Sequence, residues 1–212
     1  MTDTSSIPFI YLASQSPRRA ELLAQLGVQH RLLLADETED AESLEAVRGA
    51  EAPAVYVQRV TRLKLSAAVA RAQQRGLWTT QVAPPILCAD TTVAMGRVIY
   101  GKPEDAKAVA QMLQALSGKT HRVLTSVGVA WRVGKQVKTG FALSESRVTF
   151  AGVSKADITA YIATGEPFGK AGSYGVQGKA AAFISNITGS YSGIMGLPLH
   201  ETALLLKQAK FL

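Results

Sequence analysis

The sequence predicts an α/β fold built on a mixed sheet. Two observations predict it: helical and strand-like segments alternate along the chain, and two pairs of strands form hairpins, which a purely parallel sheet does not contain. The composition agrees, because the chain has 212 residues, of which 47% are hydrophobic and 18% charged. These values are typical of a globular domain with an ample core, and they exclude a disordered or collagen-like chain.

The N-terminal part predicts a short strand followed directly by a helix. Residues 8–13 read PFIYLA, which is typical of a buried strand. Ser16 suits the N-cap and Pro17 the first position of the helix, which we expect to end at Gly27. Residues 36–53 are acidic and irregular, and they predict a loop.

A second helix and a second buried strand follow. Apolar residues at helical spacing predict a helix over residues 55–75, and residues 77–85 (LWTTQVAPP) predict a loop or linker. Residues 86–89 predict a buried strand that leaves the sheet at Asp90. Residues 91–100 predict a hairpin because this run turns at a Gly-Arg pair.

The C-terminal half predicts three more helices and a long hairpin. A capping box opens one of the helices, since Ser154 is followed three residues later by Asp157. Two β-rich runs meet near Gly134, which favours an antiparallel pair. The expected elements are a helix over residues 103–116, strands over 121–132 and 136–150, a helix over 155–164, an ordered glycine-rich segment over 165–196 and a helix over 197–207.

The positive charge of the chain is concentrated in its second half. The net charge is +7, and residues 107–212 hold 12 Lys and Arg against 4 Asp and Glu. This asymmetry favours an anionic partner, either nucleic acid or a phosphorylated small molecule. Runs of four basic residues do not occur and aromatic residues make up 7%, so the pattern is a poor match to a nucleic-acid platform.

Three features of the sequence predict a cytoplasmic protein. Cys88 is the single cysteine, which excludes an internal disulfide and a zinc cluster. The apolar runs are shorter than the roughly 18 residues that a membrane helix needs. The first residues lack the basic and apolar regions of a secretory signal. We therefore expect no membrane partner.

The first candidate site lies where the first strand passes into the first helix. Backbone N–H groups at a helix N-terminus attract anions, and the hydroxyl of Ser14 adds a donor. Arg18 and Arg19 fall in the first turn, where the helix dipole disfavours cations unless an anion offsets them. Their guanidinium forks suit phosphate oxygens. The alternative is a well-capped helix followed by two solvated arginines.

Five further residues are candidates for a site. Asp90 could bind a divalent metal, activate water, or cap a turn. Lys64 borders the apolar face of a helix, where it could snorkel or point into a cleft, and Lys102 could reach a phosphate or stay solvated. Gln177 in the glycine-rich run offers donors and acceptors in one amide, which suits a base edge. Glu37 in the acidic loop is the candidate for a second metal ligand.

Taken together, these motifs resemble the Maf family of nucleoside triphosphate pyrophosphatases. The resemblance covers essentially the whole chain, with the motifs in order. In one departure, Gly169 stands before Lys170 where the family often has Asp, so a carboxylate expected there is missing. The matching stretches are LASQSPRR at 12–19, ADETED at 35–40, YVQRVTRLK at 56–64, CADTTV at 88–93, GKP at 101–103, SGKTHRVLT at 117–125, KAGSYGVQG at 170–178 and GSYSGIMGLPL at 189–199.

The resemblance implies one domain over residues 1–212, with two lobes around a central cleft, of the Maf and inosine triphosphatase type. It implies a homodimeric hydrolase that uses Mg²⁺ or Mn²⁺ to convert a nucleoside triphosphate into its monophosphate and pyrophosphate. Asp90 would accept a proton from the attacking water and share the metal with Glu37. The YGVQG form at 174–178 resembles the branch that acts on dTTP and UTP, with modified pyrimidine nucleotides as further candidates. The implied substrate-binding residues are Ser14, Arg18, Arg19, Lys64, Thr91, Lys102 and Gln177, of which Arg18, Thr91 and Gln177 match positions that set substrate choice.

A second interpretation is a non-enzymatic regulator of cell division that binds nucleotide or nucleic acid, since the family has been linked to septum formation. Replacing Asp90 by Asn separates the two. An enzyme should lose turnover and keep nucleotide binding, whereas a binding protein has no turnover to lose.

Overall fold

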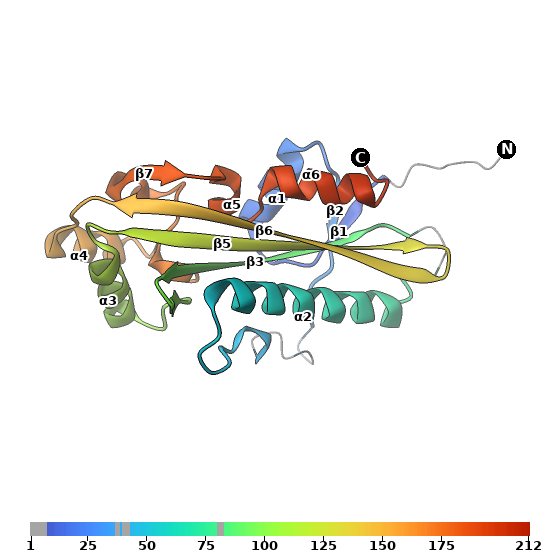
Figure 1. Ribbon diagram of the computed structural model, residues 1–212, viewed down its shortest axis with the longest axis horizontal. Helices are drawn as coiled ribbons and strands as arrows, with labels where there is room; N and C mark the ends of the chain where they lie inside the picture. The colour runs from blue at the N-terminus through green and yellow to red at the C-terminus, as the bar shows by residue number, and fades with distance from the viewer. Residues whose placement is uncertain (1–7, 37–38, 40–42, 80–82) are drawn as a thin grey trace.

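The computed structural model of the protein describes residues 8–36, 39, 43–79 and 83–212. Over these ranges the strands form one seven-stranded sheet in the order β2-β1-β3-β5-β6-β7, with β4 paired to β3 outside this path (Figure 1). The strands are β1 (Ile10–Leu12), β2 (His30–Leu32), β3 (Ile86–Met95), β4 (Val98–Tyr100), β5 (Thr120–Val133), β6 (Gln136–Phe150) and β7 (Ile184–Thr188).

The sheet is mixed. β1 pairs in parallel with β2 and with β3, whereas β3, β5, β6 and β7 pair antiparallel in succession. β5 and β6 form the long hairpin, in which Thr120 faces Thr149 and Val133 faces Gln136. The hairpin turns at Gly134, whose φ of 60° strains any residue with a Cβ atom. The predicted mixed α/β fold and its long hairpin are confirmed.

Helices cover both faces of the sheet. α2 (Pro53–Gln74) runs along one face against β3 and β5, and α6 (Leu199–Gln208) lies on the opposite face against β5 and β6 (Figure 1). None of the helices in the described ranges is long and apolar enough to cross a membrane. The other helical elements are α1 (Pro17–Gln25), η1 (Ser43–Glu45), α3 (Ala106–Leu116), α4 (Lys155–Ala163), η2 (Ala171–Ser173), η3 (Lys179–Phe183) and α5 (Tyr191–Met195).

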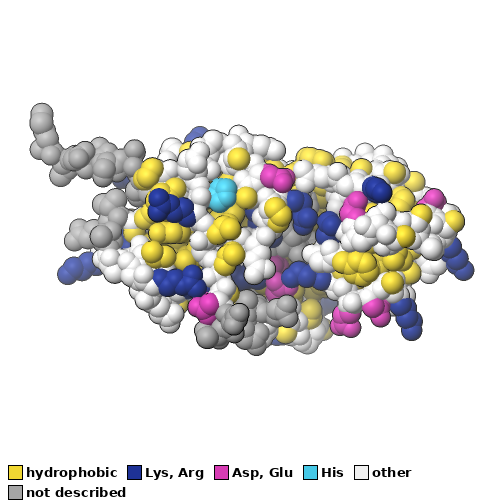
Figure 2. Space-filling view, turned by 180° about the vertical axis from the view of Figure 1, so that it is seen from behind, with side chains coloured by type: hydrophobic (Ala, Val, Ile, Leu, Met, Phe, Trp, Pro, Cys, Tyr) yellow, Lys and Arg dark blue, Asp and Glu magenta, His cyan; other side chains and the backbone are white. Residues whose placement is uncertain are grey.

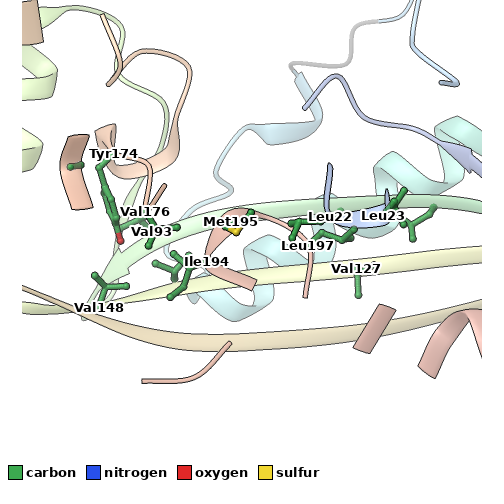
Figure 3. Packing of buried hydrophobic residues seen from close by; sticks show 14 of the residues in the cluster. Leu22, Leu23, Val93, Val127, Val148, Tyr174, Val176, Ile194, Met195 and Leu197 are labelled. Atoms are coloured by element: carbon green, nitrogen blue, oxygen red, sulfur yellow. The ribbon is translucent and has the colours of Figure 1, made fainter. Parts of the chain in front are cut away.

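The largest hydrophobic cluster joins the sheet to the glycine-rich segment. Figure 3 shows part of it, with Leu22 of α1, Val93 of β3 and Ile194 of α5 on separate elements. Tyr174 and Val176 of the glycine-rich segment lie close to Val93 in the same view. The segment therefore belongs to the core, which confirms that it is ordered.

The structure corrects the predicted end of one strand and decides between the two alternatives for residues 77–85. β3 spans Ile86–Met95, so Asp90 lies in the middle of this strand and not at its end, because antiparallel pairing with β5 continues past it. Residues 77–85 form a loop and not a linker where the structure describes them. Trp78 of this loop is only 1% exposed, and its indole N–H donates to the carbonyl oxygen of Pro84 at 2.7 Å.

Candidate active site

A cleft of about 760 Å³ opens beside the start of α1 and the middle of β3. Figure 2 shows a face of the molecule that is hollowed at its middle, with Lys, Arg and acidic side chains around the hollow. Glu37, predicted as a metal ligand, lies outside the described residues. The other predicted site residues all line the cleft: Ser14, Arg18, Arg19, Lys64, Asp90, Thr91, Lys102 and Gln177.

An ion pair between Lys64 of α2 and Asp90 of β3 lies in this cleft. The Lys64 Nζ is 2.6 Å from Asp90 Oδ1, and Asp90 is 7% exposed. Burial alone would lower the pKa of Lys64, but the charges of Asp90 and Glu45 outweigh it and raise this pKa above its usual value. Lys64 therefore points into the cleft as a cation, beside a carboxylate that can accept a proton.

Glu45 is a residue of this site that the sequence did not reveal. It ends η1 in the acidic loop, and its two oxygens accept hydrogen bonds from Lys64 at 2.7 Å and Lys102 at 3.0 Å. Burial alone would raise the pKa of Glu45, but the two lysines outweigh it and hold this pKa below its usual range. Lys64 and Lys102, which were predicted to bind phosphate, are thus both paired with the Glu45 carboxylate in this structure.

Arg19 acts as a brace between distant segments. Its Nε donates to the carbonyl oxygen of Gly196 at 2.8 Å, and its Nη1 donates to Ser14 Oγ at 2.9 Å. Its Nη2 lies 3.4 Å from Thr91 Oγ1, which in turn lies 2.9 Å from Thr125 Oγ1. Burial lowers the pKa of Arg19 from its usual value. Most of the guanidinium fork is therefore used to hold the walls of the cleft together.

Arg18 differs from its neighbour. It is half-buried in the cleft wall, and it makes no ion pair with any residue in the described ranges. A guanidinium that lines a cleft without a carboxylate partner is available to an anionic ligand. Of the two predicted arginines, Arg18 is thus the better placed for direct contact with phosphate.

Arg71 is a second lining residue that the sequence did not reveal. From α2 it donates to both carboxylate oxygens of Glu39 at 2.6 Å and to the carbonyl oxygen of Leu33 at 2.8 Å. The hydrogen bond from Arg71 holds the pKa of Glu39 below its usual range. This pair fixes one point of the acidic loop against the helix that carries Lys64.

Gln177 lies exposed at the cleft, in a turn closed by the bond from the N–H of Gly178 to the carbonyl oxygen of Gly175 at 3.1 Å. A Cβ atom at Gly178 would lie 2.0 Å from the carboxylate of Glu166, so any other residue there would require the Glu166 side chain to move. The turn thus presents the Gln177 amide on a fixed backbone, with donor and acceptor atoms free for a ligand.

The donor atoms of the cleft fit a magnesium or manganese ion that is shared with a phosphorylated substrate. Mg²⁺ is commonly held by one or two carboxylates together with substrate phosphates. Asp90 supplies one such carboxylate. Glu45 supplies a second one close by, since both carboxylates accept a hydrogen bond from Lys64. Within the described ranges, no group of three His, Cys, Asp or Glu side chains could hold an ion alone. Among the described residues, Asp90 and Glu45 are thus carboxylates that could hold such an ion together with substrate phosphates.

Comparison with known proteins agrees with this geometry. The family model described as "Maf-like protein" matches residues 9–209, and the chain belongs to the Maf family. A relative from Albidiferax ferrireducens, named dTTP/UTP pyrophosphatase, is 60% identical over 203 residues, which cover 96% of this chain and 98% of the relative. Relatives of the same name from a Polaromonas species and from Burkholderia pseudomallei are 59% and 53% identical, covering 95% and 96% of this chain and 96% and 95% of theirs. The resemblance inferred from the motifs is confirmed.

A solved structure, the Ham1 protein of Staphylococcus aureus, is a distant match. It has a TM-score of 0.38 and 11% sequence identity, over 67% of this chain and 71% of that one. Similarity at this level has no bearing on function.

Proposed function

We propose that this protein is a nucleoside triphosphate pyrophosphatase that hydrolyses dTTP and UTP to the monophosphate and pyrophosphate. One observation carries the proposal: a largely buried carboxylate, Asp90, lies beside Lys64 in a cleft whose other cations are either unpaired within the described ranges or displaceable. The name shared by relatives at 53–60% identity supports the choice of substrate.

In this mechanism Asp90 is the general base. A water molecule attacks the α-phosphorus, its proton passes to the Asp90 carboxylate, and the bond from the α-phosphorus to the bridging oxygen breaks. Pyrophosphate leaves with the electrons of that bond. Lys64 holds the carboxylate in place, and the cations Arg18 and Lys102 bind the triphosphate.

Asp90 would also hold the divalent cation, with Glu37 as the second protein ligand implied by the resemblance. When bound, Mg²⁺ or Mn²⁺ neutralises charge on the triphosphate and on the leaving pyrophosphate. Arg19 holds the hydroxyl groups of Ser14 and Thr91 in position in the cleft, so that Ser14 can donate to a phosphate oxygen.

Gln177 would select the base. Thymine and uracil present one ring N–H and carbonyl oxygens on the same edge, which an amide group can match with an acceptor and a donor. Thr91 and Arg18 line the same cleft and are the other expected determinants of substrate choice. We also propose that the protein forms a homodimer, as the resemblance implies. Its proposed location is the cytoplasm, as the sequence predicts.

The test is release of pyrophosphate from dTTP, UTP, CTP, ATP, GTP and methylated GTP, with Mg²⁺ or Mn²⁺. We expect turnover of dTTP and UTP, and none after chelation of the metal. The Asp90→Asn variant should lose about 10²- to 10⁴-fold in kcat, which is the usual contribution of a general base, while it still binds dTTP. A protein that binds nucleotides but releases no pyrophosphate from any of them would instead be the regulator described above.

A further inference from the structure

We propose that Lys170 is a further substrate-binding residue, whose ammonium group binds phosphate oxygens of the triphosphate together with Arg18. This inference rests on the proposed function. Lys170 lies directly before η2, in the glycine-rich segment, and its side chain lines the same cleft as Arg18 and Lys102. Lys170 is the first residue of the stretch KAGSYGVQG. Its place there indicates no role by itself, because a lysine before a short turn is usually solvated.

Lys170 has no carboxylate partner in the described part of the chain. Its Nζ donates to the backbone carbonyl oxygen of Glu166. The carboxylate of Glu166 is already used, since it accepts from the Tyr161 hydroxyl at 3.0 Å and from the backbone N–H of Lys179 at 2.8 Å. The preceding residue, Gly169, has no side chain to supply a charge. The ammonium therefore keeps donor capacity that the described residues leave unused.

The charges around Lys170 also point to an anionic ligand. Partial burial lowers the pKa of Lys170, and the positive charge of Arg18 lowers it further. Both groups line one cleft, and neither forms an ion pair with another described residue. Two unpaired cations that repel each other are unfavourable in an empty cleft, and an anion with several charges removes this penalty.

The backbone fixes the position of Lys170 in the cleft wall. The N–H of Gly172 donates to the carbonyl oxygen of Gly101 at 3.0 Å, which ties this segment to the residue before Lys102. A Cβ atom at Gly172 would lie 2.8 Å from Val93, so the segment packs directly on β3, three residues beyond Asp90. Figure 3 shows Tyr174 and Val176 of this segment next to Val93.

The stem of the side chain is held as well. A Cβ atom at Gly175 would lie 3.2 Å from Lys170 Cε, which shows that the stem crosses the Gly175 backbone. Lys170 is thus a positioned cation, unlike a freely solvated lysine. Since Lys102 and Lys64 are bound to Glu45, Lys170 and Arg18 are the cations most available to the first phosphate group that enters.

The experiment compares Lys170→Met with the matched control Lys179→Met. Lys179 is an exposed lysine of the same segment, but it does not line the cleft. Loss of a charge-assisted hydrogen bond corresponds to about 10- to 100-fold in affinity. We therefore expect Lys170→Met to raise KM for dTTP and the inhibition constant for inorganic pyrophosphate by at least about 10-fold, with kcat changed much less. Lys179→Met should change none of these by more than about 2-fold.

Two further measurements keep the inference testable. Lys170→Arg preserves the charge and should restore pyrophosphate inhibition to within about 3-fold of the wild type. Calorimetric binding of inorganic pyrophosphate compares wild type and Lys170→Met without any turnover, so it tests Lys170 even if no nucleotide is hydrolysed. A folded Lys170→Met variant with wild-type pyrophosphate affinity would overturn the role of Lys170, and absence of turnover in the wild type would overturn only the proposed function.

Discussion

His121 of β5 and Tyr174 of the glycine-rich segment form a buried pair, with 2.7 Å between His121 Nε2 and the Tyr174 hydroxyl oxygen. His121 is 1% exposed and Tyr174 is 6% exposed. Both rings pack edge-to-face with Phe150. Tyr174 also lines the cleft. The pair therefore connects the largest hydrophobic cluster to the segment that carries Lys170 and Gln177.

The protonation of His121 should make the protein less stable in mild acid. Burial lowers its pKa from 6.5 to about 4. The unfolded chain therefore binds a proton as the pH falls below about 6.5, and the folded chain does so only near pH 4, so stability is lost across this window. Between pH 7 and 4.5, we expect His121 to account for about 2 kcal/mol of lost unfolding free energy.

Urea unfolding at the two pH values measures this effect. His121→Gln keeps a partner for the Tyr174 hydroxyl but does not titrate, so it should lose about 2 kcal/mol less than the wild type between pH 7 and 4.5. The exposed His200 supplies the control, and His200→Gln should behave as the wild type. Equal losses in the His121 and His200 variants would contradict the prediction.

The ion pair of Lys64 and Asp90 should be visible in a double-mutant cycle. Lys64→Met leaves the largely buried Asp90 carboxylate without its cation, so it should lower the unfolding free energy by about 1–3 kcal/mol. Asp90→Asn leaves Lys64 paired with Glu45 and should be better tolerated. In the double variant the loss should be smaller than in Lys64→Met alone. Strict additivity in urea unfolding would show that the two side chains do not interact.

Removing the charge of Glu45 should favour nucleotide binding. Glu45 holds Lys64 and Lys102, and an entering triphosphate competes with it for both. We expect Glu45→Gln to lower KM for dTTP about 3- to 10-fold, as for loss of a partly exposed ion pair. Glu51→Gln is the control, because Glu51 pairs with Arg59 outside the cleft. A rise in the Mg²⁺ concentration needed by Glu45→Gln would show instead that Glu45 helps to hold the metal.

The two adjacent arginines should respond differently to replacement by lysine. Arg19→Lys loses the planar fork that joins Ser14, Thr91 and Gly196, and should lower the unfolding free energy by about 1–2 kcal/mol. Arg18→Lys should stay within about 0.5 kcal/mol, because Arg18 makes no such contacts with the residues that the structure describes, yet it should raise KM for dTTP. Similar melting temperatures for both variants would show that Arg19 is no brace.

Local patterns predicted most of the elements of the fold. Pro17 opens α1, Ser154 and Asp157 form both halves of the predicted capping box, and Gly134 turns the long hairpin. These signals act within a few residues, so they can be read along the chain. The end of β3 could not be read in this way, because the strand is extended past Asp90 by pairing with β5.

The site was predictable where its residues lie in motifs, and not where tertiary contacts create it. Glu45 reaches the two lysines because its loop is fixed on α2, where the Tyr56 hydroxyl donates to its carbonyl oxygen at 2.9 Å and Arg59 donates to Ala46 at 2.8 Å. Nothing in the amino-acid sequence distinguishes Glu45 from the other acidic residues of that loop. The pairing of Arg71 with Glu39 across 32 positions is likewise a product of folding.

The contact between Arg19 and Gly196 spans 177 positions of the chain. During synthesis the N-terminal segment that contains Arg18 and Arg19 leaves the ribosome long before Gly196 is made. Until then, Arg19 lacks the acceptor that orients its fork, and the neighbouring Ser14 lacks a fixed support. The cleft is therefore assembled late, and a nascent chain that stops short of α5 contains Asp90, Lys64 and Arg18 but lacks the finished pocket that brings them together.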